Sequence, residues 1–374
     1  MNATDRLKLL SQILFSGESS QVSQLASKDV VAPVPLPLAP DDQQSLATVS
    51  DQDLAEIRKL ADSHHVVLRT FPSLQAWMAI LGNHSAAAWL DKGIGTERTR
   101  IDRALSILEP ICDALGEIGT TIVIKSLDHW PDLGSDLDLF CDADAADVVA
   151  IMKNRFRAEL EKRSWGDRLA NKWNFIVPGL PELVEIHVQR LGQTGEQTAI
   201  ARSLIARSRT VTLGERIFPV PAAEDRFAIS TLQRMYRHFY IRLCDYVDNA
   251  RLVEDGAIDY AYLRKLGETA GIWNGLATYL TVISDYVESY RGKGLSLPPE
   301  VTSATRLRGN QVHFRANFLR IPILPHSAKL YAAELGHLMM SGELRNSLRL
   351  SLLPGLATAA ALEFKLTGSD KGIW

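Results

Sequence analysis

The sequence predicts an α+β protein in which a small mixed β-sheet lies between helical regions. Apolar residues recur at helical spacing from about residue 51 to residue 115, and again after Pro221. Between these regions stand short β-branched or alternating segments that are typical of strands. The chain has 374 residues. This is about two to three times the length of a typical domain, so we expect more than one folded unit.

The composition is that of a globular protein with a substantial core, because 46% of the residues are hydrophobic and 23% are charged. The net charge of −3 argues against a global nucleic-acid or membrane-surface binder, although it allows a local basic patch. The sequence lacks a signal-peptide pattern and any apolar stretch of the about 18 residues that span a bilayer. The cysteines fit neither a zinc spacing nor a disulfide framework, and we therefore expect a cytoplasmic protein without a membrane span. They are Cys112, Cys141 and Cys244.

Residues 1–50 are expected to form an N-terminal arm, and residues 51–96 a helical region. A short helix is predicted over residues 5–15, and four prolines within residues 31–40 indicate an extended linker. Apolar residues at three-residue spacing after Asp51, with acidic residues in the first turn, predict the next helix. Further helical patterns follow at residues 74–81, 86–90 and 101–115.

The strands are expected within residues 97–222, which would form an α/β core. Residues 120–124 read TTIVI, and such a short β-branched run is typical of a buried strand. Strict alternation at residues 136–141 predicts a second strand, and a helix is expected at residues 145–157. A hairpin across a Pro-Gly turn and a further strand pair follow. Their strands are residues 173–177 with 183–188, and residues 210–213 with 217–220.

Residues 223–374 are expected to form a helical domain. Helical patterns run from Pro221 to Tyr290, and again from about Ser327 to the end of the chain. The apolar stretch at residues 352–364 is short and contains Pro-Gly, so it indicates a packed helix rather than a membrane anchor.

Two aspartates on the second predicted strand carry the densest chemistry of the sequence. Alternate side chains of a strand share one face, so Asp136 and Asp138 point the same way while Leu137 and Leu139 enter the core. Like charges this close repel each other unless a cation lies between them. Mg²⁺ is the natural partner, because it takes oxygen ligands and bridges to substrate phosphates. An EF-hand is excluded, since the required glycine and glutamate of its loop are absent.

A later predicted strand, LVEIHV, repeats this pattern with Glu185 and His187 on one face. Glu185 is expected to bring a third carboxylate beside the first two. Three carboxylates around one or two metal ions suit an in-line phosphoryl displacement. His187 is expected to shuttle a proton or to orient the carboxylate. The alternative interpretation is a solvated acidic face in which Glu185 pairs with a lysine.

These motifs resemble the polymerase-β-like nucleotidyltransferase superfamily. Within it, the chain is most similar to the uncharacterised bacterial nucleotidyltransferase family, which reads as strand, Lys-Gly, short helix, Ser-Asp-x-Asp-Leu and a later Glu-x-His. The resemblance covers residues 97–290. The matching positions are Ile124-Lys125-Ser126, Ser135-Asp136-Leu137-Asp138-Leu139 and Val184-Glu185-Ile186-His187.

The resemblance implies a small mixed-sheet nucleotidyltransferase core. It implies that Asp136 and Asp138 hold the metal ions, and that Glu185 is the third ligand or the base that takes the proton of the acceptor.

The chain departs from the superfamily directly after the first strand. Where the superfamily has Gly-Ser or Gly-Gly, this chain has Lys125 and Ser126, so the close backbone approach that glycine allows is lost. We expect Lys125 to contact a phosphate directly instead. Ser126 and Ser135 are expected either to bind substrate or to form turns.

Arginines are concentrated in residues 202–251, which contain nine Arg, no Lys and five acidic residues. Arg234 and Arg237, on a predicted helix, are expected to bind a triphosphate or a polyanionic acceptor. The alternative is that the arginines of this region pair with four of its acids, which are Glu224, Asp225, Asp245 and Asp248. A second basic stretch with aromatic residues, at residues 306–320, could stack a base.

The expected activity is therefore a Mg²⁺-dependent transfer of a nucleotidyl group from an NTP, by default ATP, to a hydroxyl or amine. The acceptor stays open between a small molecule, a protein side chain and a tRNA-like RNA end. Two alternatives use the same residues: a catalytically silent member of the fold that binds a nucleotide or a partner, and a phosphotransferase that passes on the γ-phosphate.

Overall fold

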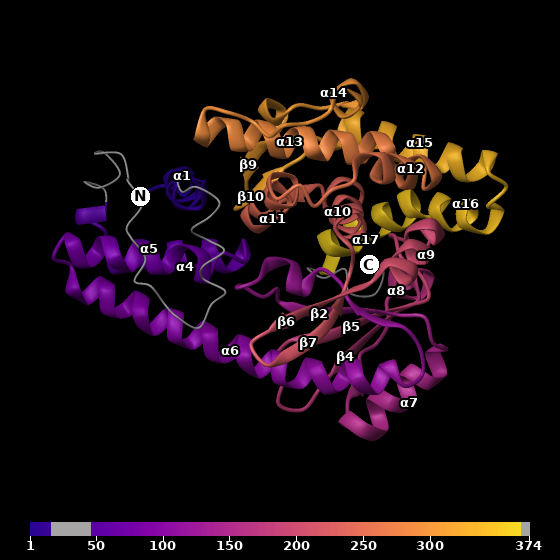
Figure 1. Ribbon diagram of the computed structural model, residues 1–374, viewed down its shortest axis with the longest axis horizontal. Helices are drawn as coiled ribbons and strands as arrows, with labels where there is room; N and C mark the ends of the chain where they lie inside the picture. The colour runs from indigo at the N-terminus through magenta and orange to yellow at the C-terminus, as the bar shows by residue number, and fades with distance from the viewer. Residues whose placement is uncertain (16–45, 368–374) are drawn as a thin grey trace.

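A computed structural model describes residues 1–15 and 46–367 of the chain (Figure 1). It confirms a mixed α+β fold with a small mixed sheet and helices at both ends of the chain. The expected proline-rich linker at residues 31–40 lies outside the described residues. In the described part, no helix combines the length and the apolar content needed to cross a membrane.

The central sheet contains five strands in the order β1-β2-β5-β4-β3. Strands β2 and β5 are parallel, whereas the other neighbouring pairs are antiparallel. The predicted strands and the hairpin are present with shifts of one or two residues at their ends. The bounds are β1 (Thr121–Val123), β2 (Asp136–Cys141), β3 (Glu159–Leu160), β4 (Lys172–Ile176) and β5 (Leu183–Val188).

The predicted second strand pair is also present, as the two-stranded sheet β6 (Arg209–Leu213) and β7 (Arg216–Val220). Strand β7 packs against β1 and against the long helix α6 (His84–Gly116). Short helices lie between the strands. They are η2 (Ser126–His129), α7 (Ala145–Phe156), α8 (Trp165–Ala170) and α9 (Thr198–Arg207).

The N-terminal helices are α1 (Ala3–Phe15), α4 (Asp51–Ser63), α5 (Val67–Ile80) and α6. Helix α4 begins where the sequence predicts, because Ser50 and Asp53 form a reciprocal capping box that satisfies two backbone amides. The two helical patterns predicted at residues 86–90 and 101–115 belong to one helix of 33 residues, α6, which also runs through the expected boundary between residues 96 and 97. Figure 1 shows α6 extending from the N-terminal helices to the sheet.

The C-terminal half is less uniformly helical than the sequence pattern predicts. After α10 (Ala223–Thr231) the chain forms a π-helical segment, η3 (Leu232–His238), which ends at Phe239 with a positive φ of 54°. The two-residue strand β8 (Tyr240–Ile241) follows and pairs with β10 (Phe318–Arg320), which in turn pairs with β9 (His313–Arg315). This second mixed region joins segments that lie far apart in the chain.

Four further elements of the C-terminal half pack against the largely buried helix α13 (Trp273–Arg291). They are α11 (Leu243–Glu254), α12 (Tyr260–Thr269), α14 (Pro299–Ala304) and η4 (Gly309–Gln311). The described chain ends in η5 (Ile323–Ser327), α15 (Ala328–Met340), α16 (Leu344–Ser351) and α17 (Leu353–Thr367), where α15 packs against η5 and α16.

Candidate functional site

The parallel pairing of β2 and β5 brings the predicted carboxylates together. The register places Asp138 directly opposite Glu185, and Phe140 opposite His187. Asp136 and Asp138 share one face of β2, while Leu137 and Leu139 are fully buried on the other. The alternation in the sequence therefore positions three carboxylates and one imidazole on a single face of the sheet.

The ammonium group of Lys125 lies between two of these carboxylates. Its Nζ is 2.5 Å from Oδ1 of Asp138 and 3.6 Å from Oε1 of Glu185. The same nitrogen is 3.4 Å from Nε2 of His187. Lys125 thus occupies the space between the carboxylates, whereas the sequence analysis expects it to contact a phosphate.

Lys125 is held there by an unusual backbone turn. The N–H of Ser126 donates to the carbonyl of Ile124 at 2.6 Å, and Lys125 between them has φ 59° and ψ −55°. This is a γ-turn with positive φ, a conformation that is rare and strained for a residue with a side chain. A glycine would adopt this conformation without strain, but the chain has a lysine here.

Ser126 fixes the turn to strand β2. Its Oγ accepts the N–H of Asp138 at 2.7 Å and donates to the carbonyl of Asp136 at 3.1 Å. Ser126 is buried, so it is a positioning residue for the two aspartates. Ser135 is exposed, and its Oγ lies 3.5 Å from Oδ2 of Asp136.

Lys172 is a site residue that the sequence analysis missed. Its Nζ lies 2.9 Å from Oε2 of Glu185 and 2.9 Å from Oδ1 of Asp167. Burial lowers the pKa of Lys172, but the charges of Glu185 and Asp167 outweigh burial, so the pKa is raised. The only signal in the sequence was a lysine directly before the predicted strand at 173–177, and the register of β4 against β5 brings it to Glu185.

The charges at this site are not balanced, because three carboxylates face two ammonium groups. Burial would raise the pKa of Glu185, but Lys125, Lys172 and a hydrogen bond from His187 hold it well below its usual range. Lys125 and Lys172 also act on Asp136, but they do not outweigh its burial. Burial raises the pKa of Asp136 to about 6, and the negative charges of Asp138 and Glu185 add to this effect.

His187 is turned toward Glu185. Its Nε2 lies 2.9 Å from Oε1 of Glu185, so Nε2–H donates to this carboxylate. The other ring nitrogen, Nδ1, is buried and has no hydrogen-bond partner among the described residues. Asp138, Glu185 and His187 each offer one ligand atom, and these atoms lie within 4.8 Å of one another. This group overlaps with the predicted metal ligands at Asp138 and Glu185, while Asp136 stands beside it.

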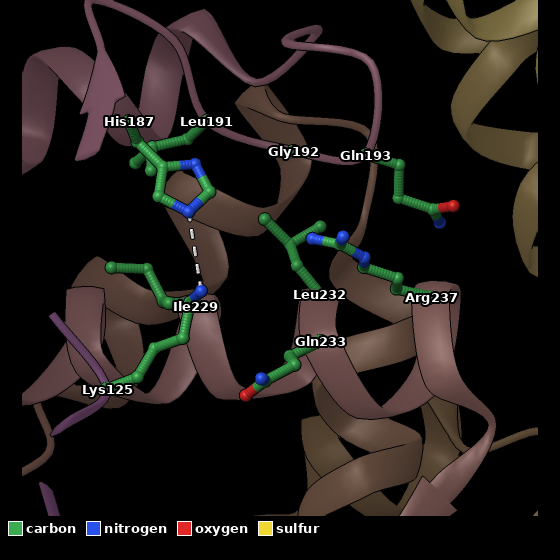
Figure 2. A pocket seen from close by; sticks show the side chains of 9 residues that line it. All are labelled: Lys125, His187, Leu191, Gly192, Gln193, Ile229, Leu232, Gln233 and Arg237. Atoms are coloured by element: carbon green, nitrogen blue, oxygen red, sulfur yellow. Dashed lines mark hydrogen bonds between the residues drawn. The ribbon is translucent and has the colours of Figure 1, made fainter. Parts of the chain in front are cut away.

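A small recess opens above Lys125 and His187 (Figure 2). Lys125 and His187 face each other on one side of it, and the guanidinium of Arg237 extends toward the same space from η3. Gly192 lies on its rim, where a Cβ would collide with the carboxylate of Glu196 and where φ is 97°. The recess is small, about 30 Å³, and it joins Arg237 to the carboxylate site.

The two arginines predicted to bind substrate have different surroundings. Arg234 is 1% exposed, and its Nε lies 2.7 Å from Oδ2 of Asp245. This is the internal ion pair that the sequence analysis held as the alternative. Arg237 is partly exposed and lines the recess with Lys125 and His187.

The second basic and aromatic stretch packs against the first. Phe318 lies 4.3 Å from Tyr240, measured between ring centroids, and the guanidinium of Arg320 lies over both rings. Arg308 pairs with Asp285. Phe318, an aromatic residue of the stretch that could stack a base, thus packs beside Tyr240 in this structure.

Comparison with protein-family models, curated proteins and solved structures finds no match for this chain.

Proposed function

We propose that the protein is a Mg²⁺-dependent nucleotidyltransferase that transfers NMP from an NTP, with ATP as the default, to a hydroxyl or amine. The observation that carries this proposal is the alignment of Asp136, Asp138 and Glu185 on one face of two parallel strands. Three carboxylates on a rigid sheet beside a cationic recess suit a reaction that needs positioning and charge neutralisation.

The donor set fits a divalent cation. Among the described residues, Asp138 and Glu185 contact Lys125 and Lys172. The pKa of Asp136 is raised by burial and, in addition, by the negative charges of Asp138 and Glu185. Asp136, Asp138 and Glu185 would hold Mg²⁺, because they supply the oxygen ligands that this ion prefers. When bound, the ion would polarise the phosphate and offset its charge. The low pKa of Glu185 favours the ligand role over the role of a base.

Lys125 has two positions open to it in this proposal. For Asp138 to bind a metal ion, the ammonium must leave the carboxylate, and its four-carbon side chain can then extend into the recess beside Arg237. Lys125 and Arg237 would bind the phosphates that become pyrophosphate. Lys172 remains in contact with Glu185 and Asp167, and its positive charge keeps the carboxylate of Glu185 ionised.

A catalytically silent, nucleotide-binding protein is the second candidate. The contact between Lys125 and Asp138 favours it, because the lysine already neutralises a carboxylate that a metal ion would need. A phosphotransferase would use the same metal ligands and differ only in the group that is passed on.

The experiment is calorimetric titration with each of the four NTPs, with and without Mg²⁺. We expect Mg²⁺-dependent binding to the wild type and its loss in Asp136→Asn/Asp138→Asn. The control is Asp144→Asn/Asp147→Asn, which removes the same charge just beyond the end of β2. If no NTP binds under either condition, the nucleotide-site proposal is wrong.

A second assay separates the reaction classes. NTP labelled at the α- or the γ-phosphate is incubated with protein, Mg²⁺ and acceptor candidates. Label from the α-phosphate on the product indicates nucleotidyl transfer, and label from the γ-phosphate alone indicates a phosphotransferase. Tight Mg²⁺·NTP binding without either product would favour the silent protein.

A further inference from the structure

A second hollow opens at the other end of the aspartate row. Its volume is about 310 Å³, which is the size of a small-ligand pocket. The N-terminal helices α4, α5 and α6 form most of its wall, and the loop that leads into β2 closes it. The lining that matters here consists of Arg58, His65, Glu97, Arg100, Gly134 and Ser135.

The position of this hollow relative to the carboxylates is defined by the strand. Ser135 lines the hollow, and its Oγ lies 3.5 Å from Oδ2 of Asp136, whereas Lys125 of the other recess contacts Asp138. A strand rises about 3.3 Å per residue, so the two aspartates are about 7 Å apart along β2. The hollow and the cationic recess therefore flank the two ends of the row.

An in-line displacement needs its nucleophile and its leaving group on opposite sides of the phosphorus. Lys125, Arg237 and Lys172 make one end cationic, which suits the departing pyrophosphate. The nucleophile would then approach from the opposite end of the aspartate row, next to Ser135, where the hollow lies.

The hollow has an apolar part, formed by Val67 and Leu133, and a charged part in which acidic side chains outnumber basic ones. The acids of the lining are Asp62, Glu97 and Asp132, and the bases are Arg58 and Arg100. Arg58 contacts Glu97 at 3.3 Å, and Arg100 contacts Glu97 at 2.7 Å and Glu182 at 2.5 Å. Burial lowers the pKa of His65 well below its usual value, so its ring is neutral, and its Nε2 has no partner among the described residues. Such a wall offers both donors and acceptors without an excess of positive charge. It suits hydroxyl groups, which donate and accept, better than a polyanion.

We propose that this hollow is the acceptor subsite, and that the acceptor is a small polyhydroxylated molecule. The inference rests on the proposed nucleotidyltransferase function. In the reaction, an acceptor hydroxyl oxygen forms a bond to the α-phosphorus, and the bond from that phosphorus to the pyrophosphate oxygen breaks. The hydroxyl proton passes to solvent. The products are the nucleotidylated polyol, pyrophosphate and a proton.

Gly134 allows a direct test, because a Cβ there meets only the backbone of Asp136, at 3.6 and 4.0 Å, and Gly134 does not have a positive φ. Because Gly134 lines the hollow, Gly134→Leu is designed to add bulk there without left-handed backbone strain, and Gly134→Ala adds less. The matched control is Gly95→Leu, because Gly95 is exposed on α6 and has nothing within 4 Å of its Cβ. Circular dichroism confirms that each variant folds.

The measurement is saturation-transfer NMR with myo-inositol and D-glucose, in the presence of Mg²⁺ and a non-hydrolysable ATP analogue. We expect a saturation-transfer signal from the polyol with the wild type and with Gly95→Leu. The signal should be weaker with Gly134→Ala and absent with Gly134→Leu. Absence of transfer to either polyol in the wild type overturns the inference, as does a signal that Gly134→Leu leaves unchanged. Transfer only to an oligoadenylate or a serine-containing peptide also overturns it, in favour of an RNA end or a protein side chain.

Binding of the ATP analogue is measured in the same samples by calorimetry, so that the two proposals fail separately. Mg²⁺-dependent nucleotide binding without polyol contact refutes the acceptor subsite alone. Absence of nucleotide binding refutes the proposed function and with it the acceptor role, even if the polyols contact the hollow.

Discussion

Lys125 combines backbone strain with a partly buried ionic contact. A γ-turn with positive φ places its side chain over the carboxylates, and Ser126 anchors the turn to β2 through two hydrogen bonds. Strained backbone of this kind costs about 1–3 kcal/mol, so it persists only where the surroundings impose it. Here the contact between Lys125 and Asp138 is the interaction that the turn makes accessible.

Replacing Lys125 with methionine separates its two roles. Lys125→Met keeps the length of the side chain but leaves Asp138 without its cation. We expect Mn²⁺ to bind more tightly, because no ammonium competes for the carboxylate. We expect Mg²⁺·ATP to bind about ten- to a hundredfold more weakly, since a hydrogen bond to a charged group contributes about 1.5–3 kcal/mol. Calorimetry measures both affinities.

Lys92→Met is the control for this substitution, because Lys92 is exposed on α6. It should leave both affinities unchanged. Equal Mn²⁺ affinity in the wild type and Lys125→Met would show that the lysine does not compete with metal at Asp138.

The chemistry of the site could be predicted from the sequence only where it depends on local pattern. Alternation alone places Asp136 and Asp138 on one face, and Glu185 and His187 on another strand in the same way. Lys172 could not be found, because its contact with Glu185 depends on how β4 and β5 align. Arg234 and Arg237 have the same residue type and lie three residues apart, yet packing buries one and leaves the other in the recess.

The same distinction holds for whole elements. Strand β2 is predictable because its alternation is matched by buried and partly exposed positions along its length. Strands β8, β9 and β10 have two or three residues each and are held by pairing between distant segments, so they leave no periodic signal. Helix α6 was expected as separate pieces, since Gly93 and Gly95 interrupt the apolar pattern without breaking the helix.

Helix α15 is docked through a buried carboxyl. Glu334 is 1% exposed, accepts a hydrogen bond from Gln197 and faces Glu196. The carboxylate of Glu196 accepts the N–H groups of Gln193 and Thr194, which favour its ionised form. Burial raises the pKa of Glu334 well above its usual value, and the negative charge of Glu196 adds to this. Burial also raises the pKa of Glu196, so both carboxyls of this pair keep a proton to a higher pH than exposed carboxyls do.

This arrangement predicts a pH dependence for the docking of α15. Because the folded-state pKa of Glu334 is raised, its contribution to stability is fully present below the ordinary pKa of glutamate and is lost as pH rises through the folded-state pKa. We expect the free energy of unfolding of the wild type to fall relative to Glu334→Gln over that range. Urea unfolding across pH measures this difference.

The control is Glu268→Gln, which removes an exposed carboxylate paired with Arg264 on α12. Its difference from the wild type should not depend on the protonation of Glu334. Parallel pH profiles for the wild type and Glu334→Gln would contradict a proton on Glu334.

At the scale of the whole molecule, a buried polar network joins the N-terminal helices to the C-terminal half. Asp248 on α11 lies 2.6 Å from Nη2 of Arg69 on α5 and 2.6 Å from Nδ1 of His129 in η2. Asp132, in the loop before β2, accepts the N–H groups of Leu68 and Arg69 at the start of α5. The sequence analysis held Asp248 as a partner for nearby arginines, whereas the structure pairs it with a distant one.

Breaking this network should loosen segments that are far apart in the chain. Asp248→Asn leaves the buried guanidinium of Arg69 without its closest anion, and we expect a loss of about 3–5 kcal/mol in the free energy of unfolding. Urea unfolding gives the loss, and hydrogen exchange should rise in α5 and η2 together. The control Asp255→Asn, at the exposed end of the same helix, should stay within about 0.5 kcal/mol of the wild type. Faster exchange confined to α11 would contradict a connecting role.

The pairing of β2 with β5 also sets the order in which the carboxylates come together during synthesis. The segments α7, β3, α8 and β4 lie between these two strands in the sequence and are synthesised before β5. Parallel pairing over such a separation forms slowly, because a long loop must close first. A nascent chain that ends before β5 carries Asp136 and Asp138 with Lys125 as their nearest cation and without Glu185. The complete set of carboxylates therefore exists only after the β4–β5 hairpin has been synthesised and has paired with β2.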